Sequence, residues 1–237
     1  MKILALETSA KSVSAAVTED GVLLAHAYQN TGLTHSRTLM PLVDGMLKNS
    51  GMTPGDMDLI AVAAGPGSFT GLRIGVSAAK GLAWTLEKPC CGVSTLEAMA
   101  QNLRHMDATV ICAMDARRNQ VYNAVFSAHG GTLNRMTPDR AIGLPELAAE
   151  LKNGEKEKIV VGDGAKLCYT YLQENGILCR MAPAGLIMQN AVGVAQAAGE
   201  MAARGETISA RELVPNYLRL SQAERERLAK GLKITVD

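Results

Sequence analysis

Ile-Leu-Ala-Leu-Glu-Thr-Ser-Ala-Lys-Ser-Val-Ser-Ala-Ala-Val, residues 3–17, opens the chain with two apolar runs around a small polar turn. Residues 111–125, Ile-Cys-Ala-Met-Asp-Ala-Arg-Arg-Asn-Gln-Val-Tyr-Asn-Ala-Val, follow the same plan, with Asp115 in the place of Glu7. In each segment a strand ends in an acid, a loop follows, and a second strand closes on Ala-Val. Such self-similarity is typical of a duplicated unit. The alternative is a chance likeness between two half-buried hairpins.

The composition suits a chain with two lobes. Its 237 residues are 47% hydrophobic and 20% charged, which is enough for two cores built from about 100 residues each. We expect an α/β fold of two similar lobes, each with a mixed sheet and flanking helices. The expected division is a first lobe at residues 1–106, a second lobe at 107–217 and a charged helical tail at 218–237.

Apolar patterns with periods of two and 3.6 residues predict the elements of each lobe. Strands are expected at residues 2–6, 13–17, 22–28, 59–63, 109–113, 121–126, 158–161 and 178–181. Helices are expected at residues 34–50, 71–86, 145–153 and 188–204, with another beginning at Ser94 and a last one capped by Ser221. That order fits a duplicated β-β-β-α-β-α unit.

A glycine-rich run, Gly-Pro-Gly-Ser-Phe-Thr-Gly-Leu-Arg-Ile-Gly at residues 65–75, links a predicted strand to a predicted helix. It lacks the Gly-Lys-Ser/Thr ending of a P-loop, and Thr70 stands where a dinucleotide fingerprint would place its last glycine. Neither nucleotide-binding loop is therefore present. The glycines permit close backbone approach, and Ser68 or Thr70 can cap the following helix.

A strand that ends in an acid, followed by a polar turn in each lobe, resembles the actin-like ATPase superfamily (the ASKHA or RNase H-like fold). There the two turns face across a cleft and hold ATP phosphates with a metal ion, because turn amides bind phosphate and carboxylates bind Mg²⁺. The resemblance implies a cofactor site made by Glu7, Thr8, Ser9 and Asp115. Arg117-Arg118 replaces the glycine or hydroxyl of the second turn, which argues against tight ATP binding by this chain alone. The alternative is that both acids are ordinary carboxylates at strand ends.

Several motifs are similar to those of the TsaB (YeaZ-like) family, whose paralogue TsaD acts in the bacterial synthesis of N6-threonylcarbamoyladenosine (t6A) in tRNA. The resemblance covers most of the chain and is most specific in the first lobe. The motifs that carry it are the run at residues 65–75, Glu7-Thr8-Ser9, His35-Ser36, Gly92-Val93-Ser94-Thr95-Leu96, Asp115-Ala116-Arg117, Gly162-Asp163-Gly164 and Pro215-Asn216-Tyr217-Leu218-Arg219.

Membership of that family implies a scaffold and not an enzyme. TsaB is regarded as the non-catalytic partner of TsaD, which transfers a threonylcarbamoyl group to adenosine 37 of tRNAs that read codons beginning with A. The resemblance implies a heterodimer with TsaD, docking of the P-loop ATPase TsaE on that pair, contact with tRNA through the complex, and a homodimer when the chain is alone. It implies no catalytic residue and no tightly bound cofactor, with ATP or ADP a candidate ligand of the junction with TsaD.

The histidines do not predict a metal centre. Two histidines that share one ion on a helix need i, i+4 spacing, and Leu39 occupies that position relative to His35. A stand-alone ATP-dependent kinase or ATPase is one alternative function, and it needs an intact second phosphate turn. A peptidase is another, but Ser36 and His35 are adjacent on a helix and point in different directions.

The first two predicted helices carry the expected partner surface. Small residues crowd the second helix between Gly75 and Ala83, and small side chains let another helix approach closely. In TsaB proteins these two helices meet TsaD or a second TsaB copy. The predicted interface residues are His35, Leu39, Leu42, Met46, Leu72, Arg73, Val76 and Lys80. The alternative is that both helices only cover the sheet.

Charge, cysteine content and the first residues predict a soluble, cytoplasmic protein. The formal net charge of +1 provides no field that attracts nucleic acid, so any RNA contact is expected to be shared with a partner. Five cysteines without CxxC spacing are typical of a reducing compartment and do not predict a disulfide or zinc framework. No apolar run reaches the roughly 20 residues of a membrane span, and no signal-peptide pattern is present.

Overall fold

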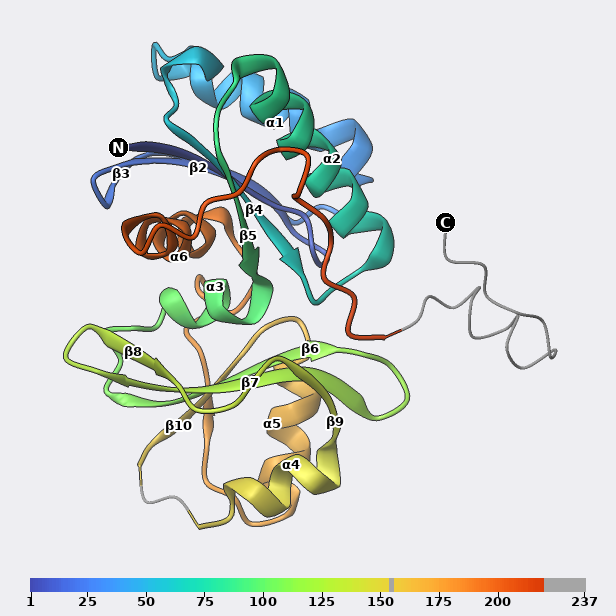
Figure 1. Ribbon diagram of the computed structural model, residues 1–237. Helices are drawn as coiled ribbons and strands as arrows, with labels where there is room; N and C mark the ends of the chain where they lie inside the picture. Colours follow the sequence, from blue (N-terminus) through green and yellow to red (C-terminus); the bar gives the residue numbers. More distant parts are fainter. Residues whose placement is uncertain (154–155, 220–237) are drawn as a thin grey trace, which may run out of the picture.

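The computed structural model describes residues 1–153 and 156–219. Two β-sheets lie one above the other, with helices on their outer faces and two further helices in the layer between them (Figure 1). Within the described residues, no helix is both long enough and apolar enough to cross a lipid bilayer. The helix expected to begin at Ser221 and most of the expected tail at 218–237 lie outside the described residues.

The first sheet has five strands in the order β3-β2-β1-β4-β5. Its strands are β1 (Lys2–Glu7), β2 (Val13–Glu19), β3 (Val22–Gln29), β4 (Leu59–Gly65) and β5 (Cys90–Ser94). β1, β2 and β3 form an antiparallel meander, whereas β4 and β5 run parallel to β1. The predicted meander at the start of the chain is therefore confirmed.

The second sheet repeats this topology with the order β11-β10-β6-β7-β8, and β9 pairs with β7. Its strands are β6 (Ala108–Asp115), β7 (Gln120–His129), β8 (Thr132–Arg135), β9 (Arg140–Gly143), β10 (Lys158–Val161) and β11 (Arg180–Met181). β6 and β10 are parallel, as β1 and β4 are, and β6 and β7 are antiparallel, as β1 and β2 are. The expected α/β class and the arrangement in two similar lobes are confirmed.

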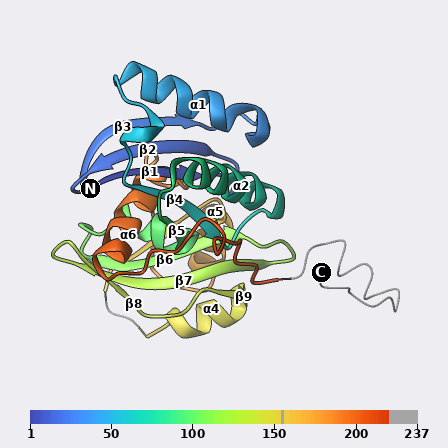
Figure 2. The same cartoon turned by 45° about the horizontal axis from the view of Figure 1, so that its top comes forward.

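The helices occupy three layers. They are α1 (His35–Asn49), α2 (Phe69–Leu86), α3 (Thr95–Gln101), α4 (Leu144–Leu151), α5 (Ala165–Glu174) and α6 (Ala191–Ala203), with a 3-10 turn at Pro54–Asp56. α1 and α2 lie beside each other on the outer face of the first sheet (Figure 2), and α4 and α5 cover the outer face of the second. The sequence patterns did not predict α5, β5, β8 or β9.

The two inner helices cross between the lobes. Leu96 and Met99 of α3 pack with the second sheet although α3 follows the first sheet in sequence. Val194 and Ala198 of α6 pack on the first sheet although α6 follows the second. The expected boundary at residue 106 falls between the two sheets. α6 buries its apolar face against the first sheet, and α3 packs on α6 and contacts both sheets, so these two helices join the two predicted lobes.

Candidate functional site

The two repeated turns follow the ends of β1 and β6, where the actin-like resemblance predicts phosphate binding. In the first turn, Glu7, Thr8 and Ser9 have no exposed surface. In the second, Asp115 and Arg117 are exposed. The duplicated turns therefore differ in their access to solvent.

The first turn is closed by hydrogen bonds within the first lobe. The Ser9 amide donates to Oε1 of Glu7 at 2.5 Å, and the Thr8 hydroxyl donates to the Gly71 carbonyl oxygen at 2.7 Å. The Ser68 amide donates to the Ser9 carbonyl oxygen at 2.7 Å. The Ser9 amide and the Thr8 hydroxyl are thus bonded to the chain itself, whereas the buried Ser9 hydroxyl has no hydrogen-bond partner among the described residues.

The glycine-rich run explains how α2 comes so close to this turn. A Cβ on Gly67 would meet the Ser9 backbone, a Cβ on Gly71 would meet the Thr8 carbonyl, and a Cβ on Gly75 would meet the Thr8 hydroxyl. The predicted close backbone approach is confirmed, and its target is the chain's own polar turn. The helix cap is Ser68, whose Oγ accepts from the Gly71 amide at 3.3 Å.

The second turn repeats the acid-to-amide hydrogen bond in an exposed setting. Oδ1 of Asp115 accepts from the Arg117 amide at 2.8 Å, and the Arg117 guanidinium lies 3.5 Å from Oδ2 of Asp115. Arg117, Arg118 and Asn119 have φ values of 67°, 58° and 57°, the left-handed region that L residues seldom occupy in succession. This turn is strained and accessible.

Two carboxyl groups, those of Glu7 and Asp163, have raised pKa values. Burial raises the pKa of Glu7 to about 7, and the charge of Asp163 adds to that rise. Burial also raises the pKa of Asp163, although a hydrogen bond of 3.0 Å from Nε2 of Gln189 lowers it. Oε2 of Glu7 and Oε1 of Gln189 have no hydrogen-bond partner among the described residues. The Glu7 carboxyl group is therefore protonated in a large fraction of molecules near neutral pH.

These residues do not fit ATP with its metal ion. A phosphate needs free amides and hydroxyls, but the carboxylates of Glu7 and Asp115 already hold the amide two residues further along each turn. A divalent ion needs ionised carboxylates, whereas burial favours the protonated form of Glu7. Among residues 1–153 and 156–219, no three His, Cys, Asp or Glu side chains are grouped to hold a metal.

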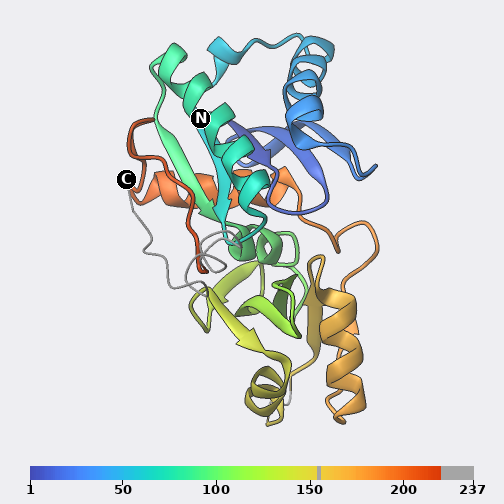
Figure 3. The ribbon, with the colours of Figure 1, turned by 90° about the vertical axis from the view of Figure 1, so that its right-hand side faces the viewer.

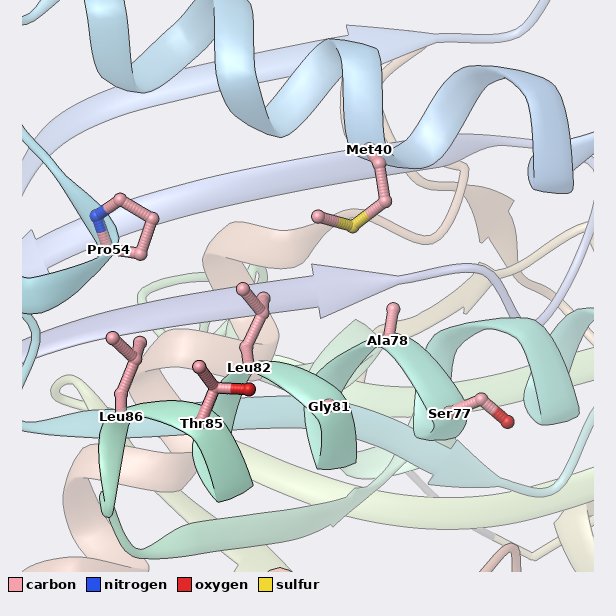
Figure 4. Close-up of a pocket in the computed structure, with 8 residues that line it drawn as sticks. All are labelled: Met40, Pro54, Ser77, Ala78, Gly81, Leu82, Thr85 and Leu86. Atoms are coloured by element: carbon pink, nitrogen blue, oxygen red, sulfur yellow. The ribbon is translucent and has the colours of Figure 1, made fainter.

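A second feature is an apolar groove between α1 and α2 (Figure 4). Met40 extends from α1 toward Ala78 and Leu82 of α2, and Pro54 lies at one end. The groove has a volume of about 480 Å³, and Met40 is 43% exposed. Its full lining is Met40, Pro54, Ser77, Ala78, Gly81, Leu82, Thr85 and Leu86. Small residues on α2 make it shallow enough for another helix.

Comparisons with known proteins identify the family. Residues 27–227 match the family model described as TsaD: tRNA N6-adenosine threonylcarbamoyltransferase. The chain is 34% identical to the tRNA threonylcarbamoyladenosine biosynthesis protein TsaB of Bacillus subtilis, over 94% of this chain and 96% of that protein. It is also 34% identical to the TsaB protein of Escherichia coli, over 92% and 95% of the two chains. The chain belongs to the TsaB (YeaZ-like) family.

Solved structures agree with this assignment. YeaZ from Pseudomonas aeruginosa has a TM-score of 0.78 and 28% identity to this chain, over 92% of this chain and 99% of that one. A protein from the same organism described as similar to peptidase YEAZ has a TM-score of 0.80, again with 28% identity over 92% and 99% of the two chains. The arrangement of His35 does not favour peptidase chemistry, because its Nε2 lies 2.7 Å from the Ala10 carbonyl oxygen while Ser36 is exposed.

The interface residues predicted for this TsaB-family chain divide into two groups. Four of them lie in the core of the first lobe and have no more than 7% exposure: Leu39, Met46, Leu72 and Val76. In this chain the four form the stripe with which α1 and α2 cover the sheet, so their side chains face the core, and their contact with a partner stays a prediction. Leu42 is half-buried against the same core.

The remaining three predicted residues contact other parts of the chain. Half-buried His35 contacts the Ala10 carbonyl, Nε of Arg73 donates to the Tyr217 hydroxyl at 2.9 Å, and Nζ of Lys80 donates to the Arg211 carbonyl at 3.2 Å. The accessible groove is offset from the core stripe and includes Ser77, Ala78 and Gly81. The sequence analysis noted these small residues but missed Met40. The position of Met40 outside the apolar stripe of α1 was the signal that could have identified it.

Proposed function

We propose that this chain is a non-catalytic accessory subunit for t6A formation at position 37 of tRNAs that read codons beginning with A. It acts by binding a TsaD-like subunit through the groove between α1 and α2. The observation that carries the proposal is family membership over nearly the whole chain together with an apolar groove on the two expected helices. In each of the two turns the acid accepts a hydrogen bond from an amide of the same turn, which supports a role without catalysis.

The chemistry of the groove suits a helical partner. Ala78 and Gly81 leave room for a backbone to approach α2, while Met40 and Leu82 supply apolar side chains that a partner would remove from water. Trp84 on the same helix is 70% exposed, and large aromatic residues are enriched at protein interfaces. A partner with its own pair of amphipathic helices would complete a helix bundle here.

The wider assembly follows from the same proposal. The pair with TsaD is the platform on which the ATPase TsaE docks, and tRNA is contacted through the complex. ATP or ADP binds at the junction with TsaD, since the acid in each turn of this chain is already bonded to an amide of the same turn. In isolation the groove pairs with a second copy of the chain, and the assembly works in the cytoplasm.

Gly81→Arg tests the docking surface. A Cβ at Gly81 meets nothing within 4 Å, so the arginine is accommodated in the folded chain and fills the groove. We expect affinity for TsaD, measured by calorimetry and by co-elution on size exclusion, to fall at least about 100-fold, as for blocking the centre of an interface.

Gly45→Arg is the matched control. Gly45 also lies in a helix and has open space at its Cβ, but it lines a different hollow between α1 and β3. This variant is expected to bind TsaD like the unaltered chain. Equal binding by the Gly81 and Gly45 variants would contradict docking through the groove.

A further inference from the structure

The last described residues form a strap that crosses the first lobe. We call residues 208–219 the C-terminal strap; it runs past β5 and α2 toward the second lobe (Figure 3). Ile208 exchanges backbone hydrogen bonds with Cys90 of β5 at 2.8 and 2.9 Å. Ala210 and Leu213 are buried in the core beneath α2. The first part of the strap is thus a fixed component of the first lobe.

The middle of the strap is held by the end of β4 and the start of α2. The Asn216 amide donates to the Ala64 carbonyl at 2.7 Å, and the Asn216 carbonyl occupies the space that a Cβ on Gly65 would need. The Tyr217 ring stacks on Phe69 with centroids 4.3 Å apart and planes inclined by 7°. The stacking on Phe69 and the hydrogen bond from Arg73 to its hydroxyl together fix the position of Tyr217 on α2.

The end of the strap reaches the other lobe. The Arg219 guanidinium donates to the Ala116 carbonyl oxygen at 2.7 Å, next to Asp115 in the exposed second turn. Within the second lobe, that turn is held by backbone hydrogen bonds from Ala116 to Gln120, from Gln120 to Arg117 and from Leu144 to Asn119, and by the contacts of Arg117 with Asp115. Arg219 adds a contact from outside that lobe. One segment therefore joins the first turn of α2 to the strained turn after β6.

The geometry points to the C-terminal strap as a clasp between the lobes, in which Arg219 holds the second turn and Tyr217 positions Arg219. The order of the second turn therefore depends on the contacts of Tyr217 with Phe69 and Arg73 at the start of α2. A displacement at the start of α2 is transmitted to the opposite lobe without passing through the buried layer of α3 and α6. This inference does not depend on the proposed function.

Hydrogen exchange of the full chain tests the clasp. In Arg219→Ala, amides of residues 116–120 are expected to exchange roughly three to ten times faster, as when one hydrogen bond that restrains a surface segment is lost. Tyr217→Ala is expected to give a similar increase in the same residues, because Arg219 then loses its positioning. Exchange within the body of α2 stays unchanged in Arg219→Ala.

Arg211→Ala is the matched control, because it removes the same charge from the strap at an exposed residue whose backbone carbonyl accepts from Lys80 of the first lobe. It is expected to leave exchange at residues 116–120 unaltered. Equal exchange in Arg219→Ala and Arg211→Ala would overturn the clasp. An increase in Arg219→Ala without one in Tyr217→Ala would overturn the link to α2.

Discussion

In the first lobe the turn after β1 is completely buried, and three glycines bring α2 directly against it. In the second lobe the turn after β6 is exposed, holds three successive left-handed residues and is met by Arg219 of the strap. Both turns keep the same hydrogen bond from an acid to the amide two residues on. The difference therefore lies in what covers the motif and not in the motif itself.

The two copies of the duplicated turn have different roles in the structure. The buried turn has become a part of the core that supports α2, the helix whose other face forms the groove. The exposed turn has kept access to solvent at the cost of backbone strain. Substitutions in the first turn are accordingly expected to act on stability, and those in the second on local order.

The largest effect is expected from Gly71→Ala. The added methyl group would collide with the Thr8 carbonyl, a backbone atom at the buried end of β1 that cannot move away easily. We expect a loss of about 3 kcal/mol in the free energy of unfolding, measured by urea denaturation. Gly81→Ala on the same helix, with open space at its Cβ, should be neutral or slightly stabilising. Equal stabilities for the two variants would mean that the first turn is not sealed by α2.

A smaller effect is expected from the buried carboxyl of Glu7. Its pKa of about 7 in the folded chain exceeds the ordinary value of 4.5, so the protonated form favours folding. That stabilisation is complete below about pH 4.5 and is lost as the pH rises through 7. Between pH 5 and 8, the unaltered chain should lose about 2–3 kcal/mol more than Glu7→Gln does. Parallel stability curves for the two proteins would contradict this.

Asp115→Asn is the corresponding change in the exposed turn. Because Asp115 lies at the surface, its loss should alter the free energy of unfolding by less than about 0.5 kcal/mol. A loss as large as that expected for Gly71→Ala would show that the two turns bear equally on the core.

Relieving strain in the second turn is also expected to have a small effect. Arg118 has a φ of 58°, which glycine adopts without steric cost. Arg118→Gly should raise the free energy of unfolding by about 0.5–1 kcal/mol relative to Arg118→Ala, which removes the same charge and keeps the strained backbone. Thermal unfolding of both variants gives the comparison, and a glycine variant less stable than the alanine variant would contradict the strain.

Local patterns were sufficient for much of the fold. The strand-acid-turn repeat predicted the duplication, and the apolar stripes of α1 and α2 predicted helices that cover a sheet. The packing of α3 and α6 between the lobes could not be predicted, since an apolar helix face does not specify which of two similar sheets it covers. α5 was missed because its ten residues mix apolar and polar side chains after a Gly-Asp-Gly turn.

The candidate site was predicted less completely. The glycine-rich run was predicted to permit close backbone approach, but the segment that it approaches, the turn at Thr8, is distant in sequence. Apolar spacing on α2 identified Leu72 and Val76, which face the core, because burial in the chain and burial against a partner leave the same apolar signature. The stacking of Tyr217 on Phe69 could not be predicted either, because it joins residues that are far apart in sequence.

Reconstitution of t6A formation tests the central claim most directly. Unmodified tRNA would be incubated with TsaD, TsaE and TsaC, the enzyme that makes the threonylcarbamoyl-adenylate, with and without this chain. The account predicts that t6A appears only when the chain is present, that Gly81→Arg abolishes this effect, and that the chain alone does not hydrolyse ATP. Equal amounts of t6A without the chain, or ATP hydrolysis by the chain alone, would contradict the assignment as a non-catalytic accessory subunit.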